Sequence, residues 1–268
     1  MKKGSSVCPV KTRAGRRQVM LYENLIYEKE GGVAKITINR PKLMNALSPA
    51  VLLEIKTAIH EAGEDDDVRV VVLTGAGQAF SAGADLNFLR DRKLENGRVG
   101  PVLDGPARDL IDAIQATPKV VIAMVNGYCF TGALEIVLAC DLVVASEDAR
   151  FADTHAHWGL RPSWGMSQRL PQTIGVLKAK ELSFTAGLIT AQEAERIGLV
   201  NMAVPGENLE GVVQELAKKI IANSPEAVAA YKYLYNDGAR GTLESGLELE
   251  AQTEFMIRDT NERLEKFR

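Results

Sequence analysis

Three short apolar runs constrain the fold of this chain more than any other feature. They occupy residues 68–73, 120–125 and 141–146, and segments of helical spacing lie between them. Nearly continuous apolarity is typical of strands that are covered on both faces, as in parallel sheets. Strand, helix and strand alternate along this part of the chain, which argues for crossover connections. We therefore expect an α/β fold with a mainly parallel sheet.

The segments on either side of these runs predict further elements. Residues 22–30 and 33–39 have strand patterns, and the Gly-Gly pair between them is a two-residue turn signal. A helix should begin after Ser48, because serine followed by proline is typical of an N-cap and first helical residue. Residues 76–100 are rich in small and polar residues, which predicts a long loop with a short helix.

The last third of the sequence changes character. Thr190 and Glu193 form a capping-box pattern at the start of a short helix, and a short strand is expected at residues 199–204. Beyond this strand the spacing is helical, over residues 209–222, 225–236 and 242–264. We expect an α/β core over residues 21–205 and a helical module over residues 206–268.

Composition excludes several classes of protein. The 268 residues are 46% hydrophobic and 25% charged, the balance of a soluble globular protein with a substantial core. A net charge of −3 gives no electrostatic reason to bind nucleic acid or an anionic membrane. No apolar run approaches the roughly 18 residues of a membrane span. Three scattered cysteines fit neither a disulfide framework nor a zinc site, and they indicate a reducing compartment.

Residues 1–20 form a basic tail without acidic residues. No apolar stretch follows its charges, so the pattern is not that of a secretory signal. We interpret the tail as disordered and the protein as cytoplasmic. A transit peptide that directs the protein to the mitochondrial matrix is the alternative.

The segment from Gly127 to Glu135 carries the clearest chemical signal. It follows the run at 120–125 and opens a helix, so Glu135 falls in a first helical turn. Amides at a helix start are unpaired and carry partial positive charge. They can stabilise an anion with a general acid or base beside it, which is typical of an enzyme.

A second segment of small residues, at 80–86, follows the run at 68–73. Small side chains let a ligand approach the backbone, and an oxyanion hole needs two N–H donors that converge on one oxygen. Small residues also pack helices against strands, so neither segment is specific by itself.

Several linked motifs occur in one order along the chain. They are Asn39-Arg40-Pro41-Lys42 with Asn45-Ala46-Leu47; Leu73-Thr74-Gly75 with residues 80–86; residues 123–135; Ala139-Cys140-Asp141; residues 149–152; Gln168-Arg169-Leu170; and residues 191–200. In this order the chain closely resembles the crotonase superfamily, the enoyl-CoA hydratase/isomerase family. The resemblance covers about residues 22–268 and leaves out the basic tail.

The resemblance implies a crotonase-type spiral of repeated ββα units with a C-terminal helical module. It implies a homotrimer, often paired into a hexamer as a dimer of trimers, with the C-terminal helices at the interface. The substrate is expected to be an acyl-CoA thioester. No metal and no redox cofactor are implied, since CoA is part of the substrate. RNA binding, which one branch of the family shows, is disfavoured here by the acidic charge of the chain outside the tail.

The resemblance also implies roles for individual residues. Ala84 and Gly132 match the positions whose N–H groups bind the thioester carbonyl. Glu135 matches the first of two glutamates that handle water at the alkene of the hydratases, whereas His155 stands at the position of the second. The segments expected to bind CoA contain Lys42, Leu43, Ala82, Ala84, Asp85, Leu86, Asn87 and Gly132.

Hydration of a 2-enoyl-CoA to a 3-hydroxyacyl-CoA is the expected reaction. A polarised thioester makes the β-carbon electrophilic, and water addition needs a base and an acid. The histidine leaves isomerase, dehydratase, decarboxylase or hydrolase chemistry open, on a branched, cyclic or aromatic acyl-CoA. A catalytically weak acyl-CoA-binding protein is a further alternative.

His155 itself has two interpretations. Asp153 lies two residues before it, so in an extended stretch both side chains point the same way and the carboxylate can orient or charge the imidazole. His155 then either takes part in the chemistry or only shapes the acyl site. For Cys129 and His60, packing or surface positions are the favoured interpretations, and Asp85 is expected to cap the turn that follows it.

Overall fold

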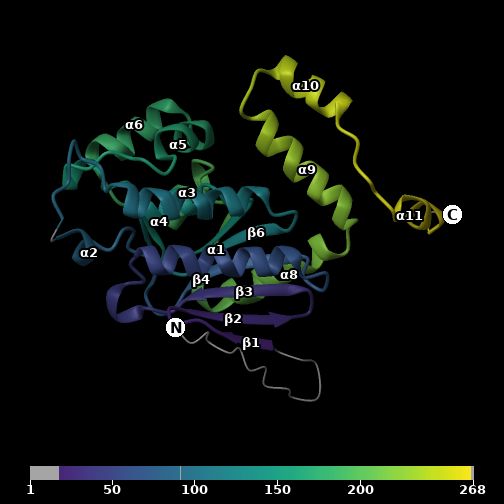
Figure 1. The fold of residues 1–268 in the computed structure, drawn as a ribbon, viewed down its shortest axis with the longest axis horizontal. Helices are drawn as coiled ribbons and strands as arrows, with labels where there is room; N and C mark the ends of the chain where they lie inside the picture. The colour runs from purple at the N-terminus through teal and green to yellow at the C-terminus, as the bar shows by residue number, and fades with distance from the viewer. Residues whose placement is uncertain (1–17, 91, 267–268) are drawn as a thin grey trace, which may run out of the picture.

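Two sheets surrounded by helices form the body of the protein, which the computed structural model describes over residues 18–90 and 92–266 (Figure 1). The larger sheet has the strand order β1-β2-β3-β4-β6-β8-β11, and the smaller has the order β10-β9-β7-β5. From β4 onwards, consecutive strands β4 and β5, β6 and β7, and β8 and β9 enter the two sheets alternately. This spiral of repeated units confirms the predicted α/β fold class.

The strands of the larger sheet are β1 (Gln18–Leu21), β2 (Leu25–Glu30), β3 (Val33–Ile38), β4 (Val70–Gly75), β6 (Val120–Val125), β8 (Leu142–Ser146) and β11 (Met202–Val204). Those of the smaller sheet are β5 (Ala79–Ser81), β7 (Tyr128–Phe130), β9 (Arg150–Ala152) and β10 (Ile189–Thr190). In the larger sheet β1, β2 and β3 pair antiparallel, and all later pairs are parallel.

The α-helices are α1 (Pro49–Glu64), α2 (Leu86–Arg90), α3 (Pro101–Ala116), α4 (Gly132–Val137), α5 (Met166–Ile174), α6 (Val176–Thr185), α7 (Ala191–Arg196), α8 (Leu209–Ile221), α9 (Pro225–Gly238), α10 (Leu243–Gln252) and α11 (Thr260–Glu265). Three short 3₁₀ helices are η1 (Pro41–Leu43), η2 (Ala156–Trp158) and η3 (Gly206–Asn208).

The central strands are apolar because both of their faces are covered. In β4, Val71 and Leu73 belong to the core that contains α1 and α3, whereas Val70 and Val72 belong to the core beneath α8. Adjacent side chains of a strand point to opposite faces, so a strand between two helical layers must be apolar at every position. This explains the continuous runs in the sequence.

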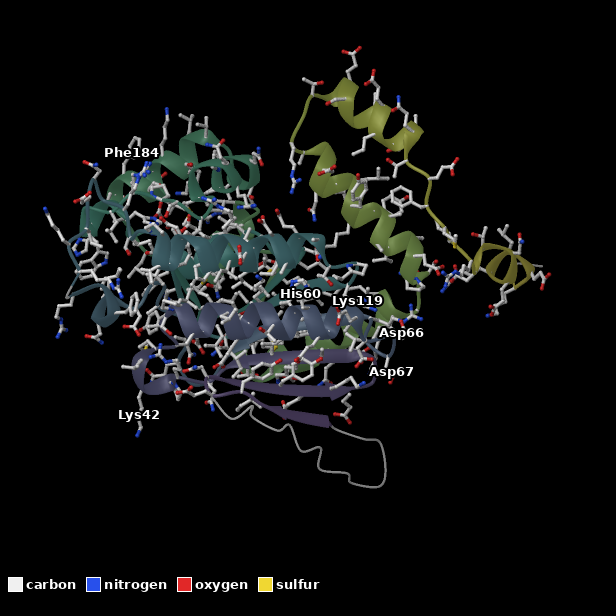
Figure 2. All side chains as sticks on the ribbon, viewed as in Figure 1. Lys42, His60, Asp66, Asp67, Lys119 and Phe184 are labelled. Carbon is white, nitrogen blue, oxygen red and sulfur yellow. The ribbon has the colours of Figure 1, made fainter. Side chains whose placement is uncertain are left out.

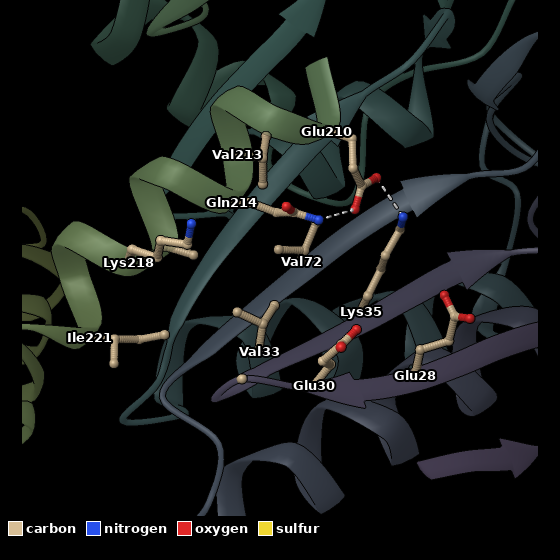
Figure 3. A pocket seen from close by; sticks show the side chains of 12 residues that line it. Glu28, Glu30, Val33, Lys35, Val72, Glu210, Val213, Gln214, Lys218 and Ile221 are labelled. Carbon is tan, nitrogen blue, oxygen red and sulfur yellow. Dashed lines mark hydrogen bonds and ion pairs between the residues drawn. The ribbon is translucent and has the colours of Figure 1, made fainter. Parts of the chain in front are cut away.

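Helix α8 packs on strands β4, β6 and β8, and a cavity of about 320 Å³ separates it from strands β2 and β3 (Figure 3). Val33, Val72 and Val213 line it with apolar surface, and Lys35 Nζ pairs with Glu210 Oε2 at its rim. Because α8 covers the sheet, the first helix of the predicted 206–268 module shares the core of the α/β spiral. The boundary near residue 206 otherwise stays a prediction.

Local signals in the sequence placed several elements correctly. Strands β2 and β3 pair around the Gly-Gly turn, and Ser48 Oγ accepts a hydrogen bond from Val51 N at the start of α1. The capping box of Thr190 and Glu193 is present at α7. His60 is exposed on α1 (Figure 2), as expected of a surface residue.

Three expectations were wrong. The basic tail was expected to be disordered through residue 20, but residues 18–21 form β1, which pairs with β2; residues 1–17 lie outside the described part of the chain. The sequence predicts loop and turn where β5 and β7 form, because strands of three residues are too short to show a sequence period. The single helix expected at 242–264 is two helices, α10 and α11.

Tertiary contacts explain the break between α10 and α11. The chain leaves the helix at Thr253, and Phe255 then packs edge-on against Tyr233 of α9, with ring centroids 5.8 Å apart. Ser224 Oγ donates to Asp259 Oδ1 at 2.5 Å. These contacts need an extended segment along α9, and a continuous helix would not make them.

Lys232 fastens α9 to the core. Its side chain is buried, and Nζ donates to Ile114 O at 2.8 Å, Lys119 O at 2.9 Å and Asp141 Oδ2 at 2.8 Å. Three acceptors satisfy the three N–H donors of the ammonium group, as a buried charge requires. Asp141 Oδ2 also accepts from Val121 N at 2.7 Å, so one ion pair connects α9 with β6.

Replacing Lys232 should weaken the fold substantially. Lys232→Met leaves the partly buried carboxylate of Asp141 without its cation, and breaking a buried pair in this way costs about 3–5 kcal/mol. The free energy of unfolding from guanidinium titration checks this value. Lys218→Met is the control, because its exposed pair with Glu215 should be worth less than about 1 kcal/mol. Equal effects of the two substitutions would contradict the role of Lys232.

Candidate active site

The segment before α1 pairs with the segment before α2. Leu47 and Ala84 form a parallel bridge, in which Leu47 N donates to Gly83 O at 2.8 Å and Asp85 N donates to Leu47 O at 3.0 Å. The carbonyl of Gly83 and the N–H of Asp85 both point toward Leu47. Because successive backbone groups point to alternate sides, the N–H of Ala84 points away from Leu47. Residues 82–87 and the neighbouring η1 are thereby brought together.

Asn45 holds this arrangement through its buried amide. Its Nδ2 donates to Ala79 O at 2.7 Å and Ala76 O at 2.9 Å, and its Oδ1 accepts from Arg40 N at 2.9 Å. A buried amide whose partners lie on two segments, the one before η1 and the one between β4 and β5, holds those segments together. The position of Ala84 therefore depends on a residue about forty positions earlier in the chain.

Gly83 brings the Ala84 segment against the start of α4. It has a φ of +89°, and a Cβ at this position would stand 2.7 Å from Phe130 O and 3.3 Å from Gly132 N. Only glycine accepts both the backbone angle and the close approach. Gly132 is the first residue of α4, so its N–H has no acceptor within the helix. The two predicted oxyanion donors thus come from adjacent segments.

Thr131, the residue before α4, has a strained backbone. Its φ of 54° is unusual for a β-branched residue. Thr131 N donates to Ala152 O at 2.8 Å, and its hydroxyl accepts from Thr154 N at 3.1 Å and lies 2.5 Å from Thr154 Oγ1. Such strain persists only where surrounding contacts hold it, and here they fix the turn that presents Gly132.

Glu135 is almost fully buried one turn into α4. Its Oε1 accepts hydrogen bonds from Trp164 N at 3.0 Å and Met166 N at 2.9 Å. Its Oε2 lies 3.7 Å from His155 Nε2. Burial raises the pKa of Glu135, and the nearby His155 and the two backbone N–H groups only partly oppose that effect. The structure therefore brings Glu135 and His155 together.

Asp153 and Ser183 hold the other side of His155. Its Nδ1 lies 2.7 Å from Asp153 Oδ1, and Ser183 Oγ of α6 donates to Asp153 Oδ2 at 2.7 Å. Burial acts to raise the pKa of Asp153, but hydrogen bonds from His155 and Ser183 outweigh it and the net pKa is lowered. The ring places Nε2 toward Glu135, and an ionised Asp153 favours a proton on Nδ1. The expected contact between Asp153 and His155 is confirmed.

The segments predicted to bind CoA lie side by side, although their side chains differ in availability. Lys42, the middle residue of η1, points into solvent (Figure 2), and Leu43, Leu86 and Asn87 are exposed. Asp85 is buried and therefore unavailable to CoA. Its Oδ1 accepts from Asn87 N at 3.1 Å at the start of α2, and its Oδ2 pairs with Arg40. The expectation that Asp85 caps the following turn is confirmed.

Two residues around Glu135 carry no signal of their own in the sequence. Asp104 of α3 accepts hydrogen bonds at Oδ1 from Ser163 Oγ at 2.7 Å and from Trp164 Nε1 at 3.0 Å. Ser183 reaches the site from α6. Each is an ordinary polar residue of a helix, and only the fold places it beside residues many positions away.

Other groups near the site take no direct part in it. Cys129 is fully buried in the apolar core, which raises its thiol pKa well above the usual range, in keeping with packing.

Across residues 18–90 and 92–266, no group of His, Cys, Asp and Glu side chains is arranged to hold a metal ion. None of the helices described there is long and apolar enough to cross a membrane.

The buried carboxylate should make stability depend on pH. Because the native pKa of Glu135 is raised, the folded state holds this proton more tightly than the unfolded chain, and the ionised group weakens the fold as pH rises above about 4.5. Glu135→Gln keeps an acceptor for both N–H donors and removes that cost. Its free energy of unfolding relative to wild type should rise from pH 4 to pH 8, by about 1.4 kcal/mol for each pH unit that separates the two pKa values. A difference that does not change with pH in denaturant titrations would contradict this account.

Comparisons with known proteins identify the family of this chain. The sequence model of the enoyl-CoA hydratase/isomerase family matches residues 28–266. The short-chain-enoyl-CoA hydratase of Clostridium acetobutylicum is 40% identical over 87% of this chain and 88% of its own length. The crotonyl-CoA hydratase of Syntrophomonas wolfei is 39% identical over 87% of this chain and 88% of its own.

Solved structures are similar in both sequence and fold. The enoyl-CoA hydratase from Bacillus anthracis has a TM-score of 0.81 at 38% identity, covering 86% of this chain and 89% of that one. The enoyl-CoA hydratase from Mycobacterium tuberculosis has a TM-score of 0.72 at 38% identity, covering 85% and 96%. This chain therefore belongs to the enoyl-CoA hydratase/isomerase family, within the crotonase superfamily.

Proposed function

We propose that this protein is an enzyme that hydrates a 2-enoyl-CoA to the corresponding 3-hydroxyacyl-CoA. One observation carries the proposal: Glu135 and His155 face each other at 3.7 Å, next to the start of α4 where the Ala84 and Gly132 segments meet. The hydratase names of relatives at about 40% identity support the same reaction.

The two backbone amides stabilise the charge that develops on the thioester. We assign the N–H groups of Ala84 and Gly132 to the carbonyl oxygen, which becomes an enolate oxygen when water adds to the β-carbon. Donors fixed by the backbone need no reorganisation during the reaction, and one such donor is worth about 10²–10³ in rate in other enzymes. The strained but well-held turn at Thr131 supports this assignment.

Glu135 and His155 supply the proton transfers. The ionised Glu135 takes a proton from water as the oxygen bonds to the β-carbon, and the raised pKa makes it a stronger base than an exposed glutamate. His155 gives a proton from Nε2 to the α-carbon, and Asp153 stabilises the imidazolium that this step requires. The sum is the addition of one water across the double bond, with both residues returned to their starting states by proton exchange.

CoA lies, in this proposal, along η1 and the segment that leads into α2. Lys42 and Leu43 are exposed there, beside Ala82, Leu86 and Asn87. The pairing of Leu47 with Ala84 supports the placement, because it makes these two stretches neighbours on the way to the oxyanion donors.

Removing the acid–base groups should abolish hydration. Glu135→Gln and His155→Gln are each expected to lower kcat for crotonyl-CoA by about 10²–10⁴, as loss of general acid–base catalysis does. His157→Gln is the matched control, because His157 is exposed and stacks edge-on with Trp158 instead of facing Glu135. Loss of the crotonyl-CoA absorbance band measures the rate. Full activity of Glu135→Gln would rule out its assigned role, and turnover restricted to other reactions of acyl-CoAs would rule out hydration.

The C-terminal helices form, we infer, the interface of a homotrimer, and trimers pair into a hexamer. Helices α9 to α11 lead away from the body of the protein (Figure 1). The exposed large apolar side chains of this segment are Tyr231, Tyr233, Tyr235, Leu243, Leu247, Met256, Ile257 and Leu264. A group of exposed apolar side chains on such an arm is typical of a protein–protein interface.

Charges on this surface should dissociate the assembly. In light scattering, the wild-type protein should have the mass of three or six chains, whereas the double variant Leu243→Asp, Leu247→Asp should have a lower mass, because a buried unpaired carboxylate opposes association. Leu53→Asp alters a similarly exposed leucine on α1 and should leave the mass unchanged. A monomeric wild-type protein would disprove the inference.

A further inference from the structure

Trp164 contacts both Glu135, the proposed base, and Gly132, one of the proposed oxyanion donors. Its backbone N–H binds Glu135, and its ring packs directly on the Cα of Gly132, so that a Cβ there would stand 2.5 Å from the ring. The three atoms nearest to that position all belong to the indole. Only 5% of the residue is exposed, so the ring is packed in place beside Gly132 and Glu135.

Asp104 fixes the indole from the opposite side. Its Oδ1 accepts from Trp164 Nε1 at 3.0 Å and from Ser163 Oγ at 2.7 Å. Arg169 NH1 donates to Trp164 O at 3.2 Å and holds the backbone. Hydrogen bonds therefore hold Trp164 at its indole N–H, its backbone N–H and its backbone carbonyl. The ring cannot swing aside without breaking hydrogen bonds that burial makes costly to lose.

This position bears directly on the acyl group. A thioester oxygen bound to Gly132 N–H lies about 3 Å from that nitrogen, and the reacting carbons must reach Glu135. The carbons immediately beyond the double bond then have the indole as their neighbour. We propose that Trp164, held in place by Asp104, limits the acyl group to short chains, a role that rests on the proposed acyl-CoA site.

A competing route for a longer chain lies beside His155. An apolar cavity of about 390 Å³ there is lined by Leu160, Met166, Leu170 and Phe184, among others. Neither Gly132, Glu135 nor Trp164 lines this cavity, which meets the site through His155, Asp153 and Met166. If the acyl chain entered it, filling it would change the chain-length preference and altering Trp164 would not.

Chain-length preference tests the proposal. The measured quantity is the ratio of kcat/KM for 2-decenoyl-CoA to that for crotonyl-CoA, which is insensitive to the fraction of folded enzyme. Trp164→Phe should raise the ratio several-fold and Trp164→Leu about tenfold or more, since one extra or missing methylene in such a pocket is worth about 10–200-fold. Asp104→Ala should raise it several-fold by freeing the indole.

Three controls define the outcome. Asp104→Asn retains an acceptor for Nε1 and should keep the wild-type ratio, as should Asp109→Ala, which removes an exposed acid of the same helix that pairs with Lys56. Val176→Phe partly fills the cavity beside His155 and should also leave the ratio unchanged. An unchanged ratio in the Trp164 and Asp104→Ala variants, a changed ratio in Val176→Phe, or a wild-type preference for decenoyl-CoA would overturn the proposal.

Binding measurements test the role of Trp164 independently of the proposed hydration reaction. Calorimetry with butyryl-CoA and decanoyl-CoA, which cannot be hydrated, gives an affinity ratio that should follow the same order among the variants. Without hydration of any enoyl-CoA by the wild-type protein, the proposed reaction fails, and the affinity ratio still decides whether Trp164 limits the chain.

Discussion

The site depends on a carboxylate kept almost entirely out of water. Glu135 is buried in the first turn of α4, and the two N–H groups that stabilise it come from the chain just before α5 and from the first residue of that helix. A buried charge without such donors would be too costly to retain. These bonds therefore fix the distance between α4 and α5, and with it the position of Trp164 over Gly132. Burial also raises the pKa of the carboxylate, the property that a general base needs.

The spiral fold delivers the parts of this site from separate repeats. Each repeat ends a strand of the large sheet, adds a short strand to the small sheet and then turns into a helix or loop. The turn after β5 presents Ala84, the turn after β7 presents Gly132, and the segment after β9 presents His155. Because β5, β7 and β9 are parallel neighbours, these three turns emerge at the same edge of the sheet. Repetition of one unit thus assembles a site from residues far apart in sequence.

Much of the fold could be predicted because its signals are local. The buried strands, the caps at Ser48 and Thr190 and the hairpin at β2 and β3 each follow from a few neighbouring residues. The failures have one cause. Strands of three residues such as β5 have no measurable period, and the break before α11 follows from contacts of Phe255 and Asp259 with another helix. Ala84, Gly132, Glu135 and His155 could be singled out through motifs, whereas their partners Asp104 and Ser183 could not.

The sequence by itself determined the α/β spiral and the family, and the resemblance to that family singled out His155. It also suggested that Asp153 contacts His155, because two residues of separation in an extended stretch put both side chains on one side. Only the tertiary structure decided that Ser183 completes this group from α6, and that Asp104 holds Trp164 across the site from α3. Those contacts join residues 30 and 60 positions apart. A sequence pattern predicts local structure, because it reflects interactions between residues that are close along the chain. Contacts of this range exist only after the core has packed and fixed each helix in place.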